Sequence, residues 1–339
     1  MKRSGTWILG AVLLWLIFSC NSENTEKKSV VMAADTVVEV DRLTEINRKI
    51  AADSNNDRLY IQRAKYYLSA GKTDSAFRDI FIAVDLNGQN PENFIALSDA
   101  YLVIGKPDKC KKALDKALSL EPGNRKALQK LAELYLIIRD YDETYRTIDK
   151  ALKEDAVNPE IYLIKGMALL EQSDTAAAVE AFKTAVYQNP DFYEANIRLG
   201  VIYSAKHNPL AVEYFNTAIN IHPENTEAYY DLGMYYQENN EVRKAVSTYR
   251  TILEIEPDNV YATYNLGYVN LVYLQDFHRA IEFFTKVIQI DPSYAEAYYN
   301  RGYAYELLGR YDSARSDYRK TLEAKTNFPK AIEGLNRLE

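Results

Sequence analysis

The sequence is poor in the residues from which catalytic and metal centres are usually built. Only two cysteines and three histidines occur among 339 residues, and His207, His222 and His278 lack the spacing of metal ligands. Zinc-protease, dithiol, serine-hydrolase and phosphate-loop motifs are also missing from the sequence. We therefore expect no enzymatic activity, no metal and no cofactor.

The sequence has no excess of positive charge either. Asp and Glu number 48 against 41 Lys and Arg, which gives a net charge of −7. Because proteins bind the phosphate backbone of nucleic acids through clustered Lys and Arg, this balance argues against a nucleic acid partner. The hydrophobic content of 47% is that of an ordinary folded protein.

Long apolar runs are absent except near the N-terminus. There, Lys2 and Arg3 precede an apolar run of 12 residues from Trp7 to Phe18. Such a run is too short to cross the ~30 Å hydrocarbon core of a bilayer, but it has the length of the apolar core of a signal peptide. We expect a signal peptide over residues 1–19 and no membrane-spanning helix after it.

The end of this run, Leu16-Ile17-Phe18-Ser19-Cys20, resembles the lipobox of bacterial lipoproteins. Leu16, Ser19 and Cys20 carry the resemblance, whereas Phe18 is bulkier than the family usually has at this place. The resemblance implies cleavage before Cys20 and lipidation of this cysteine, with palmitate among the attached chains. The alternative is an ordinary cleaved signal peptide with an incidental cysteine.

Lipidation of Cys20 would decide where the protein works. Residues 20–40 would form the lipidated cysteine and a polar tether that holds the folded part at a membrane of the bacterial cell envelope. Asn21 directly after the cysteine favours the outer membrane, on its periplasmic or surface face.

What the chain does have is a repeat with a period near 34 residues. One series of small residues is Ala64, Ser98, Ala132, Gly166, Gly200, Gly233, Gly267 and Gly302. A second series is Ala76, Cys110, Thr144, Ala178, Ala211, Ala245, Ala280 and Ala314. Prolines mark repeat ends at Pro122, Pro190, Pro223, Pro257 and Pro292. The agreement of the three series predicts an array of eight repeats.

Each repeat has the pattern of two amphipathic helices with a break between them. Small residues such as Gly302 and Ala314 are expected where the two helices cross, because a larger side chain would hold the backbones apart. Cys110 belongs to the second small-residue series, so we interpret it as a buried packing residue and not as a nucleophile. Two short helices cannot bury their apolar faces alone, but stacking on the next repeat can.

The repeat resembles the tetratricopeptide repeat (TPR). The residues that match its pattern most fully are Tyr229, Leu232, Gly233, Tyr236, Ala245, Tyr249 and Pro257. The resemblance implies an all-α fold, a right-handed superhelical α-solenoid of about eight repeats. These would lie at 57–90, 91–124, 125–158, 159–192, 193–225, 226–259, 260–294 and 295–328, between capping helices at 41–56 and 329–339.

Departures from the pattern are local. The third repeat has Ala132, Thr144 and Ile148 at signature places, and the first ends at Gly88 where others have proline. The fifth repeat is one residue shorter. The seventh is one residue longer and has Asn270 where the pattern has tyrosine.

In this family the first helix of each repeat lines a concave groove. The resemblance therefore gives candidate partner-binding residues, which are Tyr230, Met234, Tyr261, Tyr264, Tyr268, Tyr299, Tyr303, Glu194, Glu227 and Glu296. One interpretation is a docking track for an extended or helical peptide, in which tyrosines supply contact area and the acids favour basic ligands. The other is that the tyrosines fill packing gaps and the glutamates complement helix N-termini.

The sequence thus predicts a non-enzymatic, membrane-tethered scaffold of the bacterial envelope that binds a protein or peptide in its groove. The family's clamp for chaperone C-termini is absent, because no repeat has Lys at its fifth place. Assembly of secretion, pilus, outer-membrane or cell-wall machinery would suit such a scaffold. The alternatives are a self-assembling structural subunit that forms homo-oligomers, or a regulator that docks cell-wall or polysaccharide enzymes.

Overall fold

The computed structural model describes residues 34–339, with side chains from Arg42 onward. The expected signal peptide, Cys20 and the first part of the expected tether lie outside the described residues. The chain divides into two compact units, of which unit 1 ends at Pro190 and unit 2 begins at Asp191.

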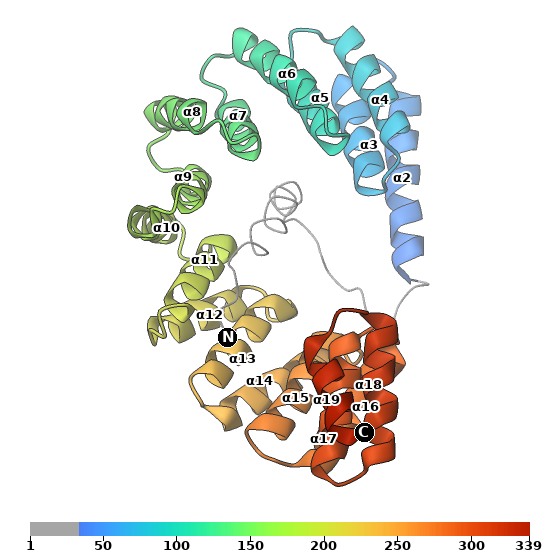
Figure 1. The fold of residues 1–339 in the computed structure, drawn as a ribbon. Helices are drawn as coiled ribbons and strands as arrows, with labels where there is room; N and C mark the ends of the chain where they lie inside the picture. Colours follow the sequence, from blue (N-terminus) through green and yellow to red (C-terminus); the bar gives the residue numbers. More distant parts are fainter. Residues whose placement is uncertain (1–33) are drawn as a thin grey trace. The chain divides into compact units, whose positions relative to one another are not determined.

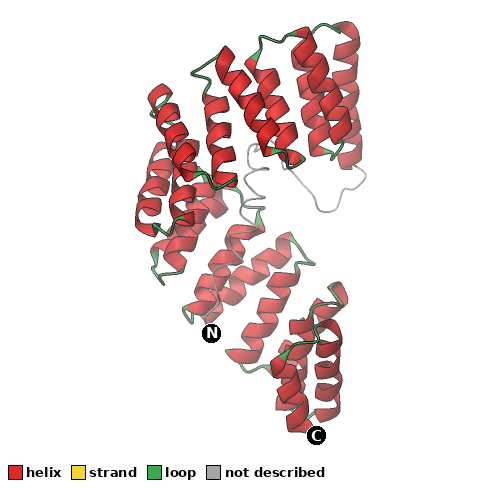
Figure 2. Cartoon of the chain, turned by 45° about the horizontal axis from the view of Figure 1, so that its top comes forward, coloured by secondary structure: helices red, strands yellow, loops and turns green. Residues whose placement is uncertain are grey.

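The described part of the chain consists of helices joined by short turns, without a strand (Figures 1 and 2). Unit 1 contains α2 (Ala34–Ala52), α3 (Asp57–Ser69), α4 (Thr73–Leu86), α5 (Pro91–Val103), α6 (Pro107–Leu120), α7 (Arg125–Ile137), α8 (Tyr141–Glu154), α9 (Pro159–Glu171) and α10 (Thr175–Gln188). Unit 2 contains α11 (Tyr193–Ser204), α12 (Leu210–Ile221), α13 (Thr226–Glu238), α14 (Val242–Ile255), α15 (Val260–Val272), α16 (Phe277–Ile290), α17 (Ala295–Leu307), α18 (Tyr311–Ala324) and α19 (Pro329–Leu338). Over residues 34–339, none of these helices combines the length and apolar composition of a membrane span.

Within each unit, consecutive helices pair as antiparallel hairpins, and each hairpin packs on the next. The glycines of the first small-residue series show why the pairing needs small residues. A Cβ added at Gly166 would lie 2.4 Å from the ring of Phe182, and one at Gly233 would lie 2.6 Å from the ring of Tyr249. Phe182 and Tyr249 are themselves fully buried, so their rings have little room to move.

The turn between the two helices of each repeat contains one residue with a left-handed backbone. These residues are Gly71, Gly105, Arg139, Ser173, His207, Asn240, Gln275 and Gly309. A left-handed residue just after a helix satisfies its last carbonyl groups and reverses the chain. His207 is therefore part of a turn, where its Nδ1 lies 3.2 Å from Oδ1 of Asn239.

Asparagines explain where many of the first helices begin. Asn124 Oδ1 accepts a hydrogen bond from the backbone N–H of Ala127, and Asn259 Oδ1 accepts one from Ala262. Asn90, Asn158 and Asn225 cap their helices in the same way. Side-chain capping of this kind satisfies backbone donors that have no partner within the helix.

Helices α2 and α19 cover the two ends of the array. Ile46 and Ile50 of α2 pack against Tyr60 and Ile61 of α3, and Ala331 of α19 packs against Tyr318 of α18. Helix α2 begins at Ala34, which is earlier than the boundary expected from the sequence, since no proline or glycine interrupts residues 33–52. The all-α solenoid of stacked hairpins is confirmed in each unit.

Candidate partner-binding surface

The first helices of the last three repeats, α13, α15 and α17, carry most of the candidate residues. We call Tyr230, Tyr261, Tyr264, Tyr268, Tyr299 and Tyr303 the tyrosine face. The face spans neighbouring repeats within unit 2, because Tyr230 of α13 meets Tyr261 of α15 edge to face, with ring centroids 6.2 Å apart.

Tyr261 is the most accessible member of the tyrosine face. Its side chain is 61% exposed, whereas the other members are only partly exposed. Tyr261 thus remains exposed to water, although the ring of Tyr230 lies beside it. An exposed aromatic side chain of this kind is available to a partner.

Tyr264 and Tyr299 are packed more deeply. The ring of Tyr264 lies 5.6 Å from that of Phe284 and 5.1 Å from that of Tyr294, and its hydroxyl accepts a hydrogen bond from Nδ2 of Asn300 at 2.7 Å. Burial is the main cause that raises the pKa of Tyr264, and the nearby Tyr294 is the second.

The ring of Tyr299 contacts three other rings. Tyr303 and Tyr318 stack on it at 6.4 and 5.8 Å, and Phe328 lies at 5.1 Å. Tyr299 thus packs within the last repeat, in addition to any contact that it makes with a partner.

The remaining apolar candidates lie beside the same face. The ring of Tyr268 is 6.4 Å from that of Tyr273, which belongs to the turn after α15. Sδ of Met234 lies 3.7 Å from Nδ2 of Asn265, so Met234 contacts the next repeat.

Two of the candidate glutamates belong to a mixed cluster between α11 and α13. Glu194, Glu227 and Asp231 all interact electrostatically with Arg198. Tyr193 donates a hydrogen bond from its hydroxyl to Oε2 of Glu227 at 3.2 Å. Burial lowers the pKa of Arg198, although the carboxylates act in the opposite direction.

Asp231 is the most strongly perturbed carboxyl of this cluster. Burial and the carboxylate of Glu227 raise the pKa of Asp231 to about 7, while Arg198 acts in the opposite direction. The third candidate glutamate, Glu296, lies elsewhere on unit 2 and forms an exposed ion pair with Lys325 at 3.0 Å.

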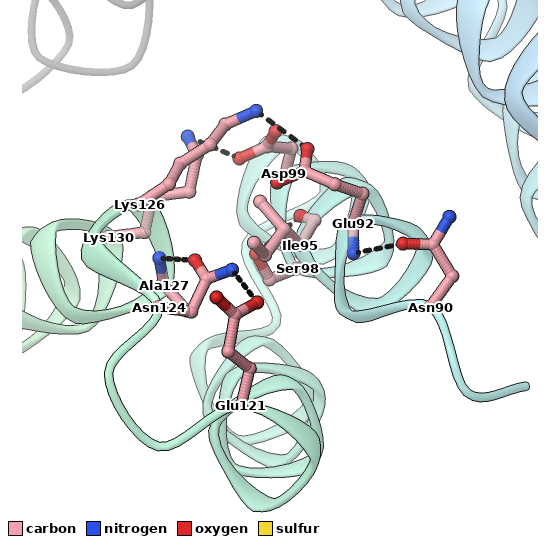
Figure 3. A network of polar contacts seen from close by, with 10 residues as sticks. All are labelled: Asn90, Glu92, Ile95, Ser98, Asp99, Glu121, Asn124, Lys126, Ala127 and Lys130. Atoms are coloured by element: carbon pink, nitrogen blue, oxygen red, sulfur yellow. Dashed lines mark hydrogen bonds and ion pairs between the residues drawn. The ribbon is translucent and has the colours of Figure 1, made fainter.

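Unit 1 has a different polar surface on its first helices, which Figure 3 shows from close by. Lys126 of α7 pairs with Glu92 of α5 at 3.0 Å, and Lys130 pairs with Asp99 at 2.7 Å. These ion pairs connect consecutive repeats of unit 1.

Sequence reasoning missed three charged residues at the sixth place of their repeats. Lys130, Arg198 and Asp231 occupy this place and take part in the polar clusters just described. A sixth-place residue lies next to the fifth-place residue on the same helix, so the charged residues at this place in the third, fifth and sixth repeats were the available signal.

The described residues contain no group of three or more His, Cys, Asp and Glu side chains that could hold a metal ion. Cys110 is 2% exposed and packs with Leu114 and Leu131. Burial raises the pKa of the Cys110 thiol to about 12, which leaves it far from the thiolate form at neutral pH.

Profiles described as tetratricopeptide repeat match residues 91–134, 132–191, 163–226, 214–247 and 295–333, and one described as TPR repeat matches 270–309. Together they span well over half of the chain. A comparison with curated proteins gives no match.

Several solved structures share the fold. The C-terminal part of a TPR repeat-containing protein from Cytophaga hutchinsonii is 19% identical, with 70% of this chain and 98% of that one covered and a TM-score of 0.60. PilF of Pseudomonas aeruginosa is 17% identical, with 61% and 94% covered and a TM-score of 0.51. A tetratricopeptide repeat protein from Parabacteroides merdae is 18% identical, with 74% and 99% covered and a TM-score of 0.50.

The repeat period, the glycines at the helix crossings, the left-handed turns and the profile matches all indicate the same kind of repeat. The protein belongs to the tetratricopeptide repeat family, whose members mediate interactions between proteins.

Proposed function

We propose that this protein is a non-enzymatic scaffold that binds a protein or peptide partner over the tyrosine face of unit 2. The observation that carries the proposal is the exposed ring of Tyr261 beside that of Tyr230. Tyrosine gives a rigid apolar surface with a polar tip, and such residues are enriched among those that dominate binding energy.

The partner that suits this face carries basic residues next to apolar ones. Glu227 lies on α13, the helix that also carries Tyr230, and Glu296 lies on α17 with Tyr299 and Tyr303. A partner with lysine or arginine would complement these carboxylates, whereas an acidic partner would be repelled.

The proposal also places the scaffold at a membrane. Its support is the sequence Leu16–Cys20, from which we infer a lipid anchor at Cys20 and an envelope location, with the outer membrane favoured. A tethered scaffold of this kind suits the assembly of secretion, pilus, outer-membrane or cell-wall machinery.

Replacing Cys20 by serine tests the anchor. The wild-type protein is expected in the membrane fraction of its bacterial host, with the mass of acyl chains added at its N-terminus. The Cys20→Ser variant is expected to lack this mass and, where the apolar run Trp7–Phe18 has been cleaved off, to leave the membrane fraction. An unchanged distribution in detergent-free fractionation, with no mass added to the wild-type N-terminus, would contradict lipidation.

Replacing Tyr261 by alanine tests the binding face. We expect affinity capture from detergent-solubilised envelope to recover a specific partner with the wild type and about ten-fold less of it with Tyr261→Ala, as for a residue at the centre of an interface. Tyr187 on α10 is a matched control, because it is an 87% exposed tyrosine outside unit 2. Recovery of the protein alone would favour self-assembly, and equal recovery with both variants would remove the tyrosine face from the proposal.

A further inference from the structure

The seventh repeat lacks a tyrosine that most other repeats have. Three residues after the crossing position, six repeats carry Tyr67, Tyr101, Tyr135, Tyr203, Tyr236 and Tyr305. The fourth repeat has Leu169 at this place, and the seventh has Asn270. The change from a phenol ring to a small amide removes a large volume from the interior of the repeat.

In other repeats this tyrosine packs against a second helix, either of its own repeat or of the preceding one. The ring of Tyr203 on α11 stacks on that of Tyr214 on α12, with centroids 5.6 Å apart. The ring of Tyr101 on α5 lies 5.2 Å from the ring of Phe77 on α4, which is the second helix of the repeat before it. Tyr135, Tyr203 and Tyr236 are each at most 9% exposed. The ring therefore fills the space between a first helix and its neighbours.

Asn270 leaves that space open. Its side chain is 4% exposed and turns back to its own helix, where Nδ2 donates a hydrogen bond to the carbonyl oxygen of Leu266 at 2.7 Å. Beside it lies a cavity of about 160 Å³ between α14, α15 and α16. The cavity walls include Val246 and Arg250 of α14 and Phe283 of α16.

The one-residue insertion of the seventh repeat completes the same cavity. It lengthens the turn after α15, and Leu274 of this turn is part of the cavity wall. Leu274 is 50% exposed, so an apolar side chain of the longer turn lies at the opening of the cavity.

We propose that this cavity, which we call the ring slot, binds a tyrosine side chain of a protein partner. The volume suits one ring, since an engineered cavity of about 150 Å³ binds benzene, and it is far below the range of about 300 Å³ and more that cofactor sites need. The partner's ring would take the place that the chain's own tyrosine occupies in six other repeats.

The charges around the ring slot favour tyrosine over other side chains. The guanidinium groups of Arg250 and Arg279 line the ring slot, and a guanidinium can stack on an aromatic face. Glu282 supplies an acceptor for a phenolic hydroxyl, which phenylalanine would leave unused. The ring slot uses α14 and α16 as well as α15, so it is a contact separate from the tyrosine face.

Binding of p-cresol, the free form of a tyrosine side chain, tests this assignment on the full chain. Calorimetric titration is expected to give a dissociation constant on the order of a millimolar for the wild type, as suits so small a ligand. Asn270→Tyr supplies the missing ring from within and Val246→Phe fills the ring slot from the opposite wall, and each should weaken binding at least ten-fold. Leu169→Tyr is the matched control, because it adds the same ring at the same place of the fourth repeat and should leave binding unchanged.

The two filling variants keep the test informative if one of them fails to fold, which circular dichroism would reveal. Asn270→Tyr is also expected to raise the melting temperature, because its ring restores packing present in the other repeats. Equal binding of p-cresol to the wild type and to a folded filling variant would overturn the proposal. So would the absence of binding to the wild type at about ten times the expected dissociation constant.

Discussion

Replacing Asp317 by alanine is expected to destabilise the last repeat by about 3–5 kcal/mol, because it leaves a buried arginine without its counter-charge. Arg301 donates hydrogen bonds from Nε and Nη2 to the two carboxylate oxygens of Asp317, at 2.7 and 2.8 Å. The side chains are 15% and 5% exposed, so water cannot replace the lost partner well. Denaturant unfolding followed by circular dichroism measures the loss.

The chain itself suggests the control. The second repeat has Leu97 and Ala113 at the places that Arg301 and Asp317 occupy in the last repeat. The double variant Arg301→Leu/Asp317→Ala reproduces this apolar pair and should recover most of the stability, since an ion pair can often be replaced by apolar residues without loss. If Asp317→Ala alone unfolds at the same denaturant concentration as the wild type, the ion pair does not stabilise the repeat.

The same pair occurs at the other end of the array. Arg63 donates to Asp79 from Nε and Nη2, both at 2.7 Å, and also donates to Oδ1 of Asn47 in α2. Among the described repeats, this bidentate pair is found in the first and the last, where the stacked hairpins meet α2 and α19. The third bond differs between the two ends, because Arg63 reaches Asn47 of the cap α2, whereas Arg301 donates to Oγ1 of Thr285 on α16 in the preceding repeat.

Replacing Asp231 by asparagine is expected to stabilise unit 2 by about 1–3 kcal/mol at pH 8 and by little at about pH 4. Burial and Glu227 raise the pKa of Asp231 from 3.8 to about 7 in the folded protein. A carboxyl with a raised pKa holds its proton more tightly when folded, so its contribution is favourable at low pH. That contribution is lost as the pH rises from about 4 to about 7, and it stays lost above this window.

Asparagine keeps the shape of the protonated carboxyl and has no charge to lose. The difference in melting temperature between Asp231→Asn and the wild type should therefore grow as the pH rises from about 4 to about 7 and then remain constant. Asp74, an acidic residue on the surface of α4, provides a control, because Asp74→Asn should give no such trend. A constant difference across this range, or a less stable variant at pH 8, would show that Asp231 is ionised without cost in the fold.

The fold could be predicted from the sequence because its determinants are local and periodic. Gly233 and Ala245 recur at fixed spacing since two backbones cross there, and a Cβ at Gly233 would meet the ring of Tyr249. Such steric requirements leave a trace at every repeat. The left-handed turns were harder to predict, because Arg139 and Ser173 adopt a backbone conformation that the sequence signals clearly only at Gly71, Gly105 and Gly309.

The candidate surface could be predicted only in outline. Repeat register places Tyr261 and Tyr264 on the same helix, but it does not tell that one is 61% exposed while the other packs on Phe284 and Tyr294. That difference arises from side chains of other helices. For the same reason the ring slot was not expected, although Asn270 stood out as a departure from the repeat pattern, because a cavity depends on whether neighbours move into the free space.

The most direct test of the scaffold proposal is photo-crosslinking from within the tyrosine face. A benzoylphenylalanine residue is larger than tyrosine, but at position 261 it projects into water, and the same residue at position 187 reports any unspecific contact. We predict that, in intact cells, position 261 crosslinks to a defined envelope protein at a segment with basic and apolar residues, and that position 187 does not. Crosslinks from both positions to the same mixture of proteins, or none from position 261, would contradict the account.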